Sequence, residues 1–112
     1  MQSKVPADFN ERLVESIDET MTALLSKGVL DSLYLHLERC FAITKDELPY
    51  RLETFFSILE KTFGSSEKTI GKAIAKRFYF KLRLEFDEKA NHNLREYVEE
   101  AKRKLQNLPP NN

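Results

Sequence analysis

The amino-acid sequence predicts a single all-α domain of about five helices, and three observations lead to this prediction. The chain has 112 residues, which is the length of one domain with one hydrophobic core. Along most of it, apolar residues recur at intervals of three and four, which places them on one face of a helix. Only three glycines and four prolines interrupt the pattern, mostly where a helix would begin or end.

The first predicted helix follows Pro6, which suits a first helical turn, and ends near Gly28. Its apolar face is formed by residues three and four positions apart: Phe9, Leu13, Ile17, Met21 and Leu24. Its opposite face is acidic and is typical of a solvated surface. The residues of that face are Asp8, Glu11, Glu15, Asp18 and Glu19.

A second helix is predicted after Gly28, with a broad apolar arc along one side. The arc contains Val29, Leu30, Leu33, Tyr34, Leu37, Cys40 and Phe41. Leu35 points away from this arc, so we expect it in solvent. Residues 42–50 are predicted to form a loop with one helical turn, because Thr44 and Glu47 have capping-box spacing and Pro49 follows closely.

The third helix is predicted over 51–63, and Gly64 is placed to end it. Its apolar face contains Leu52, Phe55, Phe56, Leu59 and Phe63.

A fourth helix is predicted to begin where Ser65 or Ser66 can cap it through a side-chain hydrogen bond. Its apolar set is Ile70, Ala73, Ile74 and Phe78. Gly71 and Ala75, four residues apart, allow a neighbouring helix to approach closely.

The segment from Phe78 to Phe86 alternates apolar and polar residues, which is the period of a strand. A lone strand needs a partner, and no second strong strand is evident in the chain. We therefore predict that the fourth helix continues to about residue 82 and that residues 83–87 form a short extended segment.

The last predicted helix follows Asn91–Asn93 and has a narrow apolar arc: Leu94, Tyr97, Val98, Ala101 and Leu105. Pro109 and Pro110 would stop it. We expect one domain over residues 1–112, with residues 1–6 and 108–112 flexible. The residues expected at the centre of its core are Phe41, Phe55, Phe56, Phe63, Ile74 and Phe78.

Composition excludes several classes of protein. One cysteine cannot form an internal disulfide, which points to a reducing compartment. No apolar run approaches the roughly 18–20 residues of a membrane span. The first residues lack the apolar stretch of a secretory signal. We therefore expect a cytoplasmic protein with no membrane partner.

The net charge of zero conceals an asymmetry between the two halves of the chain. Residues 1–64 contain 7 basic and 11 acidic side chains, whereas residues 65–112 contain 11 basic and 7 acidic ones. Two interpretations stay open. The opposite charges attract the halves to each other within one fold, or they present a basic face to a partner.

Residues suited to catalysis are few. His36 and Cys40 are four apart on one predicted helix, where they could share a metal. A structural zinc site needs about four ligands, however, and a second pair with ligand spacing is absent. The same pair lacks an orienting third group and an oxyanion hole. The run Gly64–Thr69 only superficially resembles a phosphate loop, because Glu67 stands where that loop needs glycine. We predict no catalytic residue, metal or cofactor.

The fourth predicted helix contains the clearest candidate for an interaction surface. Lys68, Lys72 and Lys76 recur at every fourth position, and Tyr79 falls beside the same stripe. Cations next to an aromatic residue are typical of nucleic-acid binders. The pI of about 6.7 lies far below the usual value for that class. Leu35, Ile58 and Tyr79 lie off the main apolar stripes, and together they would mark a partner surface.

The stretch from Gly28 to Phe86 carries a series of short motifs. They are Leu33-Tyr34-Leu35-His36-Leu37-Glu38, Ile43, Leu48-Pro49, Leu52-Glu53-Thr54-Phe55, Leu59, Phe63-Gly64, Ile70, Ala73-Ile74 and Phe78. In these residues the chain resembles a small all-helical domain family, seen mainly in archaea, whose members are mostly uncharacterised. Some of them resemble output modules of signalling proteins, so the resemblance implies an action by contact and no catalytic residue. We expect no receiver or sensor domain beside the helical one, and in this the chain would depart from such proteins.

Together, these observations predict a non-enzymatic interaction or regulatory module, of the signal-output kind, that acts through a helical surface. The candidate surface consists of Leu35, Ile58, Lys68, Lys72, Lys76 and Tyr79. The expected partner is another protein or a second copy of the chain, for which the narrow seam of the last helix is also suited. The first alternative is a nucleic-acid-binding protein using the basic face of the helix at about 66–82. The second is a small enzyme or metal protein centred on His36 and Cys40.

Overall fold

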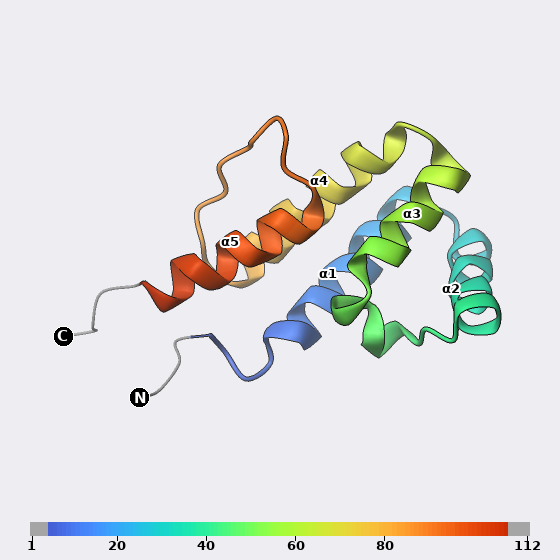
Figure 1. Cartoon of the computed structure of the whole chain (residues 1–112), viewed down its shortest axis with the longest axis horizontal. Coiled ribbons are helices and arrows are strands. Elements are labelled where there is room, and N and C mark those ends of the chain that lie inside the picture. Colours follow the sequence, from blue (N-terminus) through green and yellow to red (C-terminus); the bar gives the residue numbers. More distant parts are fainter. Residues whose placement is uncertain (1–4, 108–112) are drawn as a thin grey trace.

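Six helical segments make up the regular structure of the described part of the chain (Figure 1). The computed structural model describes residues 5–107, and within this range it contains no strand. The segments are α1 (Phe9–Leu24), α2 (Lys27–Phe41), the 3-10 helix η1 (Lys45–Tyr50), α3 (Leu52–Phe63), α4 (Ser66–Lys81) and α5 (Leu94–Gln106). The all-α prediction is confirmed. Most of the two termini expected to be flexible, and the proline stop, lie outside the described residues.

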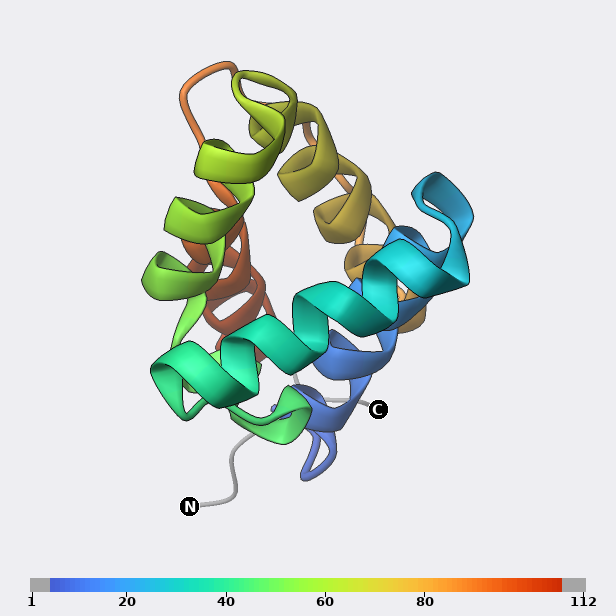
Figure 2. The same ribbon diagram turned by 90° about the vertical axis from the view of Figure 1, so that its right-hand side faces the viewer.

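Helix α4 is the central element, because it packs against α1, α3 and α5. Helix α2 crosses α1 at one end of the molecule, as Figure 2 shows. The described chain is elongated, with extents of 47 × 28 × 21 Å. Its largest fully buried side chains come from every helical segment and from the link between α2 and η1: Leu13, Ile17, Met21, Leu37, Ile43, Leu48, Phe55, Leu59, Ile74, Phe78, Tyr79 and Tyr97. None of the described helices is long and apolar enough to cross a membrane.

The boundary between the first two helices differs from the prediction. Helix α1 ends at Leu24 and α2 begins at Lys27, so Gly28 lies inside the first turn of α2. The local reason is Ser26, whose hydroxyl accepts a hydrogen bond from the backbone N–H of Val29 at 3.2 Å. This side-chain cap satisfies one of the amides that a helix start leaves unpaired, and it fixes the boundary at the serine.

The turn predicted within residues 42–50 is confirmed. The carboxylate of Glu47 accepts hydrogen bonds from the backbone N–H and the hydroxyl of Thr44, at 2.9 and 2.8 Å. These bonds lower the pKa of Glu47 below its ordinary value. Leu48 is fully buried, so η1 packs against the core through this side chain. The capping-box spacing therefore predicted the position of this segment correctly.

The junction of α3 and α4 confirms one prediction and contradicts another. Gly64 ends α3 with a φ of +64°, a conformation that favours glycine. The predicted serine cap of α4 is wrong, because the side chain of Ser65 makes no capping hydrogen bond. Instead, the backbone N–H groups of Glu67 and Lys68 bond to the carbonyls of Gly64 and Ser65 at 3.2 and 3.3 Å. The tight turn satisfies these amides without a side chain.

Gly71 makes the close helix approach that the sequence predicts. It is buried, and a Cβ atom at this position would lie 3.3 Å from the ring of Phe56 on α3. Ala75, one turn further along α4, is also fully buried. The small residues of α4 therefore let α3 pack close to it.

Helix α4 runs to Lys81, as predicted, and the alternating pattern after it forms no strand. Arg83 adopts a left-handed conformation with a φ of 59°, and residues 84–89 have no regular structure. The segment that follows is tied to α5, because the Tyr97 hydroxyl donates to the carbonyl of Lys89 at 3.1 Å and accepts from its N–H at 2.9 Å. The Lys104 ammonium also donates to the carbonyl of Glu85 at 3.2 Å.

The predicted core is only partly correct. Phe55, Ile74 and Phe78 are fully buried, as expected. Phe56 and Phe63 are half-buried at the edge of the core. The prediction for Phe41 is wrong, since 39% of it is exposed. Phe41 is the last residue of α2, and its ring lies edge-on against His36 at 5.8 Å while the core-facing stripe of that helix is filled by leucines.

Candidate functional site

The six residues of the predicted interaction surface do not form one surface. Ile58 and Tyr79, expected in solvent, are both buried within the core. The hydroxyl of Tyr79 donates to the carbonyl of Tyr97 at 2.7 Å, and its ring packs edge-on against Phe86 at 5.2 Å. Burial raises the pKa of Tyr79 well above its ordinary value. Its off-stripe position in α4 is covered by α5 and by the segment that precedes α5.

Leu35 is exposed, as predicted, but it lies on α2 while the lysines lie on α4. The narrow apolar seam of the last helix is not free for a second copy either. All five of its residues are buried in the chain's own core: Leu94, Tyr97, Val98, Ala101 and Leu105. The seam therefore offers no dimer contact.

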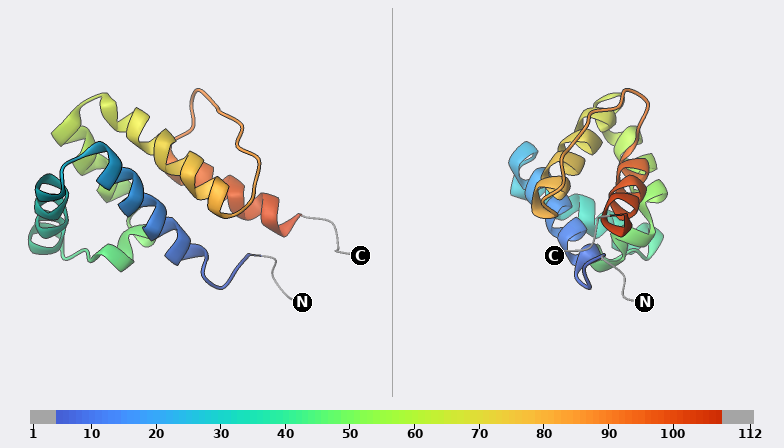
Figure 3. Two further views of the ribbon diagram at one scale, coloured as in Figure 1. Left: turned by 180° about the vertical axis from the view of Figure 1, so that it is seen from behind. Right: turned by 90° about the vertical axis from the view of Figure 1, so that its left-hand side faces the viewer.

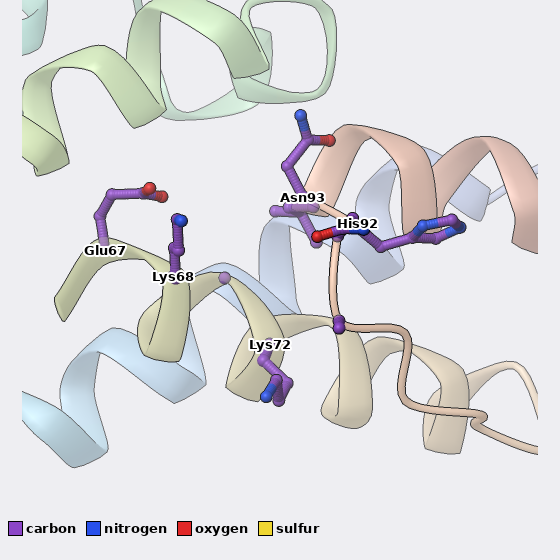
Figure 4. Close-up of a pocket in the computed structure, with 9 residues that line it drawn as sticks. Glu67, Lys68, Lys72, His92 and Asn93 are labelled. Atoms are coloured by element: carbon purple, nitrogen blue, oxygen red, sulfur yellow. The ribbon is translucent and has the colours of Figure 1, made fainter. Parts of the chain in front are cut away.

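The lysine stripe divides between two regions of α4. Lys68 and Lys72 line a hollow of about 300 Å³ between α4 and the start of α5 (Figure 4). The Lys72 ammonium donates to the Glu88 carboxylate at 2.9 Å, which raises the pKa of Lys72 and lowers that of Glu88. A partner from a distant segment therefore neutralises Lys72, which has no acidic residue four positions away in its own helix.

The hollow brings together no set of groups suited to catalysis. His92 extends away from the lysines along α5, where its Nε2 lies 3.1 Å from the Glu100 carboxylate. The side chain of Asn93 accepts a hydrogen bond from the N–H of Glu96 at 2.9 Å and so caps α5. Because these polar groups stabilise the surrounding helices, the hollow is explained by the fold itself.

His36 and Cys40 do lie together, as their spacing predicts. Their Nδ1 and Sγ atoms are 3.5 Å apart on the exposed side of α2. Within residues 5–107, no group of three or more His, Cys, Asp or Glu side chains is arranged to hold a metal ion. The pair therefore lacks the further ligands that a closed metal site requires.

Phe80 is the exposed residue that sequence reasoning missed. Its exposed fraction is 83%, the highest of any large apolar side chain in the described part of the chain. The alternation of apolar and polar residues from Phe78 to Phe86 has the period of a strand and gives no sign of an exposed Phe80. In a helix, however, residues 78 and 80 lie about 200° apart around the axis. Because Phe78 packs against Phe9 with ring centroids 5.0 Å apart, Phe80 points outward.

Cations surround Phe80. A hollow of about 580 Å³ beside it is lined by Glu19, Arg77, Lys81, Arg83 and Leu84. Lys76 lies one helical turn before Phe80 on the same outer face of α4. We call Lys76, Arg77, Phe80, Lys81 and Arg83 the basic aromatic patch.

One carboxylate holds part of this patch in place. Glu19 of α1 accepts from the Lys81 ammonium at 3.1 Å and from the Arg77 guanidinium at 3.4 Å. These two cations, Lys81 first, lower the pKa of Glu19. Lys76 and Arg83 form no ion pair with any described residue. The patch therefore presents an exposed aromatic ring beside two cations that form no ion pair within the described chain, one of which, Lys76, helps Lys72 to lower the pKa of Glu88.

Comparison with known proteins adds nothing to this geometry. No protein-family model, curated protein or solved structure matches the chain. The resemblance to archaeal output domains therefore stays a prediction.

Proposed function

We propose that this chain is a non-enzymatic interaction module that binds a partner protein through the basic aromatic patch. The observation that supports this most is the exposure of Phe80 among four cations. A single exposed apolar side chain is ordinary on a protein surface. An exposed aromatic ring beside arginines is the combination that protein interfaces favour at their centres.

The chemistry of the patch defines the partner. Phe80 and the half-buried Leu84 offer apolar contact beside the hollow. Lys76 and Arg83 attract carboxylates, while Arg77 and Lys81 are already oriented by Glu19. The patch therefore suits an acidic protein surface that carries an apolar side chain.

A nucleic acid is the second candidate partner. An aromatic ring between cations also serves as a stacking platform for the bases of a single strand. A protein partner fits the molecule better, because the whole chain has no net charge and carboxylates already neutralise Lys72, Arg77 and Lys81.

Site-specific photo-crosslinking tests the proposal. Phe80 is replaced by a benzophenone-bearing phenylalanine analogue in the native cells, and the same analogue is placed at exposed Val29 of α2 as a control. We expect protein adducts at position 80 that are absent at position 29. Adding the substitutions Lys76→Glu and Arg83→Glu should remove them.

The same experiment separates the two partners. Adducts that resist nuclease and disappear with protease support the protein partner. Adducts that nuclease removes support nucleic acid instead. If position 80 gives no more adduct than position 29, the patch is not an interaction site and the proposed function is wrong.

A further inference from the structure

A second aromatic side chain is almost as exposed to solvent as Phe80. Tyr50, the last residue of η1, is 74% exposed, the second-highest value for a large apolar residue in the described chain. It borders a hollow of about 680 Å³ between η1 and α1, whose other lining residues are Ala7, Asn10, Glu11, Val14, Glu15 and Asp46. The amide of Asn10 donates to the Tyr50 hydroxyl at 2.8 Å and orients the ring.

Tyr50 lies between two hollows: one is lined by Arg51, Arg95 and Lys102 together with Glu53 and Glu99, and the other, between η1 and α1, has charges opposite to those around Phe80. Glu11, Glu15 and Asp46 line this second hollow, and no cation lines it. None of the three carboxylates forms an ion pair with a described residue. We call Glu11, Glu15, Asp46 and Tyr50 the acidic aromatic patch.

The two patches share no residue, although Glu15 of one lies a helical turn from Glu19, which lines the hollow of the other. They adjoin two different neighbours of α1. On one flank, Asn10 reaches η1 through Tyr50. On the other flank, Arg12 donates to the carbonyl of Lys81 at 3.2 Å, and Glu19 binds Arg77 of α4. Figure 3 shows α1 between η1 and α4. Both patches of one molecule are therefore accessible at the same time.

We propose that the partner of the basic aromatic patch is the acidic aromatic patch of a second copy of this chain. This inference rests on the proposed function and names its partner. Three carboxylates with an exposed tyrosine would face an exposed phenylalanine beside Lys76 and Arg83, the two cations of the basic aromatic patch that form no ion pair with a described residue. Such complementary charges steer the two molecules together and set their register, and the rings supply apolar and cation–π contact.

The charge distribution of the chain supports the same partner. Some acidic residues of the N-terminal half form ion pairs with basic residues of the C-terminal half, as Glu19 does with Arg77 and Lys81. The charges that remain unpaired at the two patches are again of opposite sign. Because two different surfaces meet, the contact is heterologous: each copy offers one patch to one neighbour and the other patch to another.

Sedimentation velocity over a range of protein concentrations tests this inference. We expect the wild-type chain to self-associate at low salt, and less as salt screens the charges. The variant Glu11→Lys/Glu15→Lys and the variant Lys76→Glu/Arg83→Glu should each weaken association about tenfold or more, since like charges then face each other. Circular dichroism checks that each variant is folded.

The decisive sample combines all four substitutions in one chain. Both patches are then reversed, so they are complementary again and self-association should return. The matched control is Glu60→Lys/Lys61→Glu, two exposed positions of α3 outside both patches, which should associate like the wild type. If a double variant lost association because its fold was damaged, adding the other two substitutions would not restore association.

Two results would overturn the inference. One is a wild-type chain that stays monomeric at every concentration and salt, and the other is association that neither Glu11→Lys/Glu15→Lys nor Lys76→Glu/Arg83→Glu weakens. Crosslinking at position 80 distinguishes this failure from failure of the proposed function. An adduct with a different polypeptide, obtained with a monomeric chain, supports the proposed function and excludes the second copy as its partner.

Discussion

At the scale of single residues, Tyr79 and Phe80 show how strongly neighbouring positions of one helix differ. Both are aromatic, and they lie about 100° apart around the axis of α4. Tyr79 is 1% exposed and donates a hydrogen bond to Tyr97, whereas Phe80 is almost entirely in solvent. Substitution of the first should therefore change the stability of the fold, and substitution of the second should change what the fold binds.

We predict that Tyr79→Ala lowers the free energy of unfolding by about 3–5 kcal/mol, because it leaves a cavity and removes a buried hydrogen bond. Phe80→Ala should change it by no more than about 0.5 kcal/mol. Urea denaturation of the two variants measures the difference. An equal loss of stability in both would contradict the orientation of α4 described above.

At the scale of elements, the sequence predicts what local chemistry determines. The turn at Thr44 and Glu47 and the end of α3 at Gly64 depend on neighbouring residues, and both predictions are correct. The burial of Tyr79 depends on other parts of the chain, whereas the serine cap of α4 is absent because carbonyls of the adjacent turn bond to the amides instead. Periodicity shows which residues share a helix face, but it does not show which flank of that face another element covers.

The candidate sites could not be predicted for the same reason. The basic aromatic patch includes cations of α4 that are held by Glu19 of α1, 58 and 62 positions away from Arg77 and Lys81. The acidic aromatic patch joins α1 to η1. The spacing of Lys68, Lys72 and Lys76 predicts that they lie along one helix, which is α4. Only the packing shows that Lys68 and Lys72 line the hollow near α5 while Lys76 lies beside Phe80.

The two helical glycines give a prediction at the element scale. A methyl group at Gly28 would meet no atom within 4 Å, whereas one at Gly71 would lie 3.3 Å from the Phe56 ring. Gly28→Ala should therefore stabilise the protein by about 0.5–1 kcal/mol through better helix propensity. Gly71→Leu should destabilise it by about 1–3 kcal/mol through overpacking against α3.

Thermal denaturation of the two glycine variants gives the signs of these changes. Gly71→Ala serves as the intermediate case, because the gain in helix propensity opposes a contact that the half-buried Phe56 must relieve. A Gly71→Leu variant as stable as the wild type would mean that α3 and α4 do not pack closely at this point.

At the scale of the whole molecule, ion pairs connect segments distant in sequence. Lys89 and then His92 and Lys104 surround the carboxylate of Glu100, and they lower its pKa. Lys81 lowers the pKa of Glu19 and Lys72 that of Glu88. A carboxyl group whose pKa is lower in the folded state binds protons more weakly there than in the unfolded chain, so acid favours unfolding.

We therefore predict that the free energy of unfolding falls as the pH drops below about 4.5, the ordinary pKa of these groups, and continues to fall through their lower folded values. Urea denaturation at a series of pH values measures this slope. Glu100→Gln should make the slope shallower, and Glu99→Gln, at an exposed contact with Lys102, should leave it unchanged. A flat profile down to strongly acidic pH would contradict the prediction.

The pairing of α1 with α4 has a consequence for the order in which the chain folds. Phe9 packs on Phe78, and Arg12 bonds to the carbonyl of Lys81, 69 positions away. Contacts between distant residues close only after a long loop has formed, and this slows folding relative to bundles built from sequence neighbours. During synthesis, α1 is made before α4, so the part of α1 that packs on α4 has no partner until α4 has emerged. We therefore expect this protein to complete its core only after most of the chain has left the ribosome.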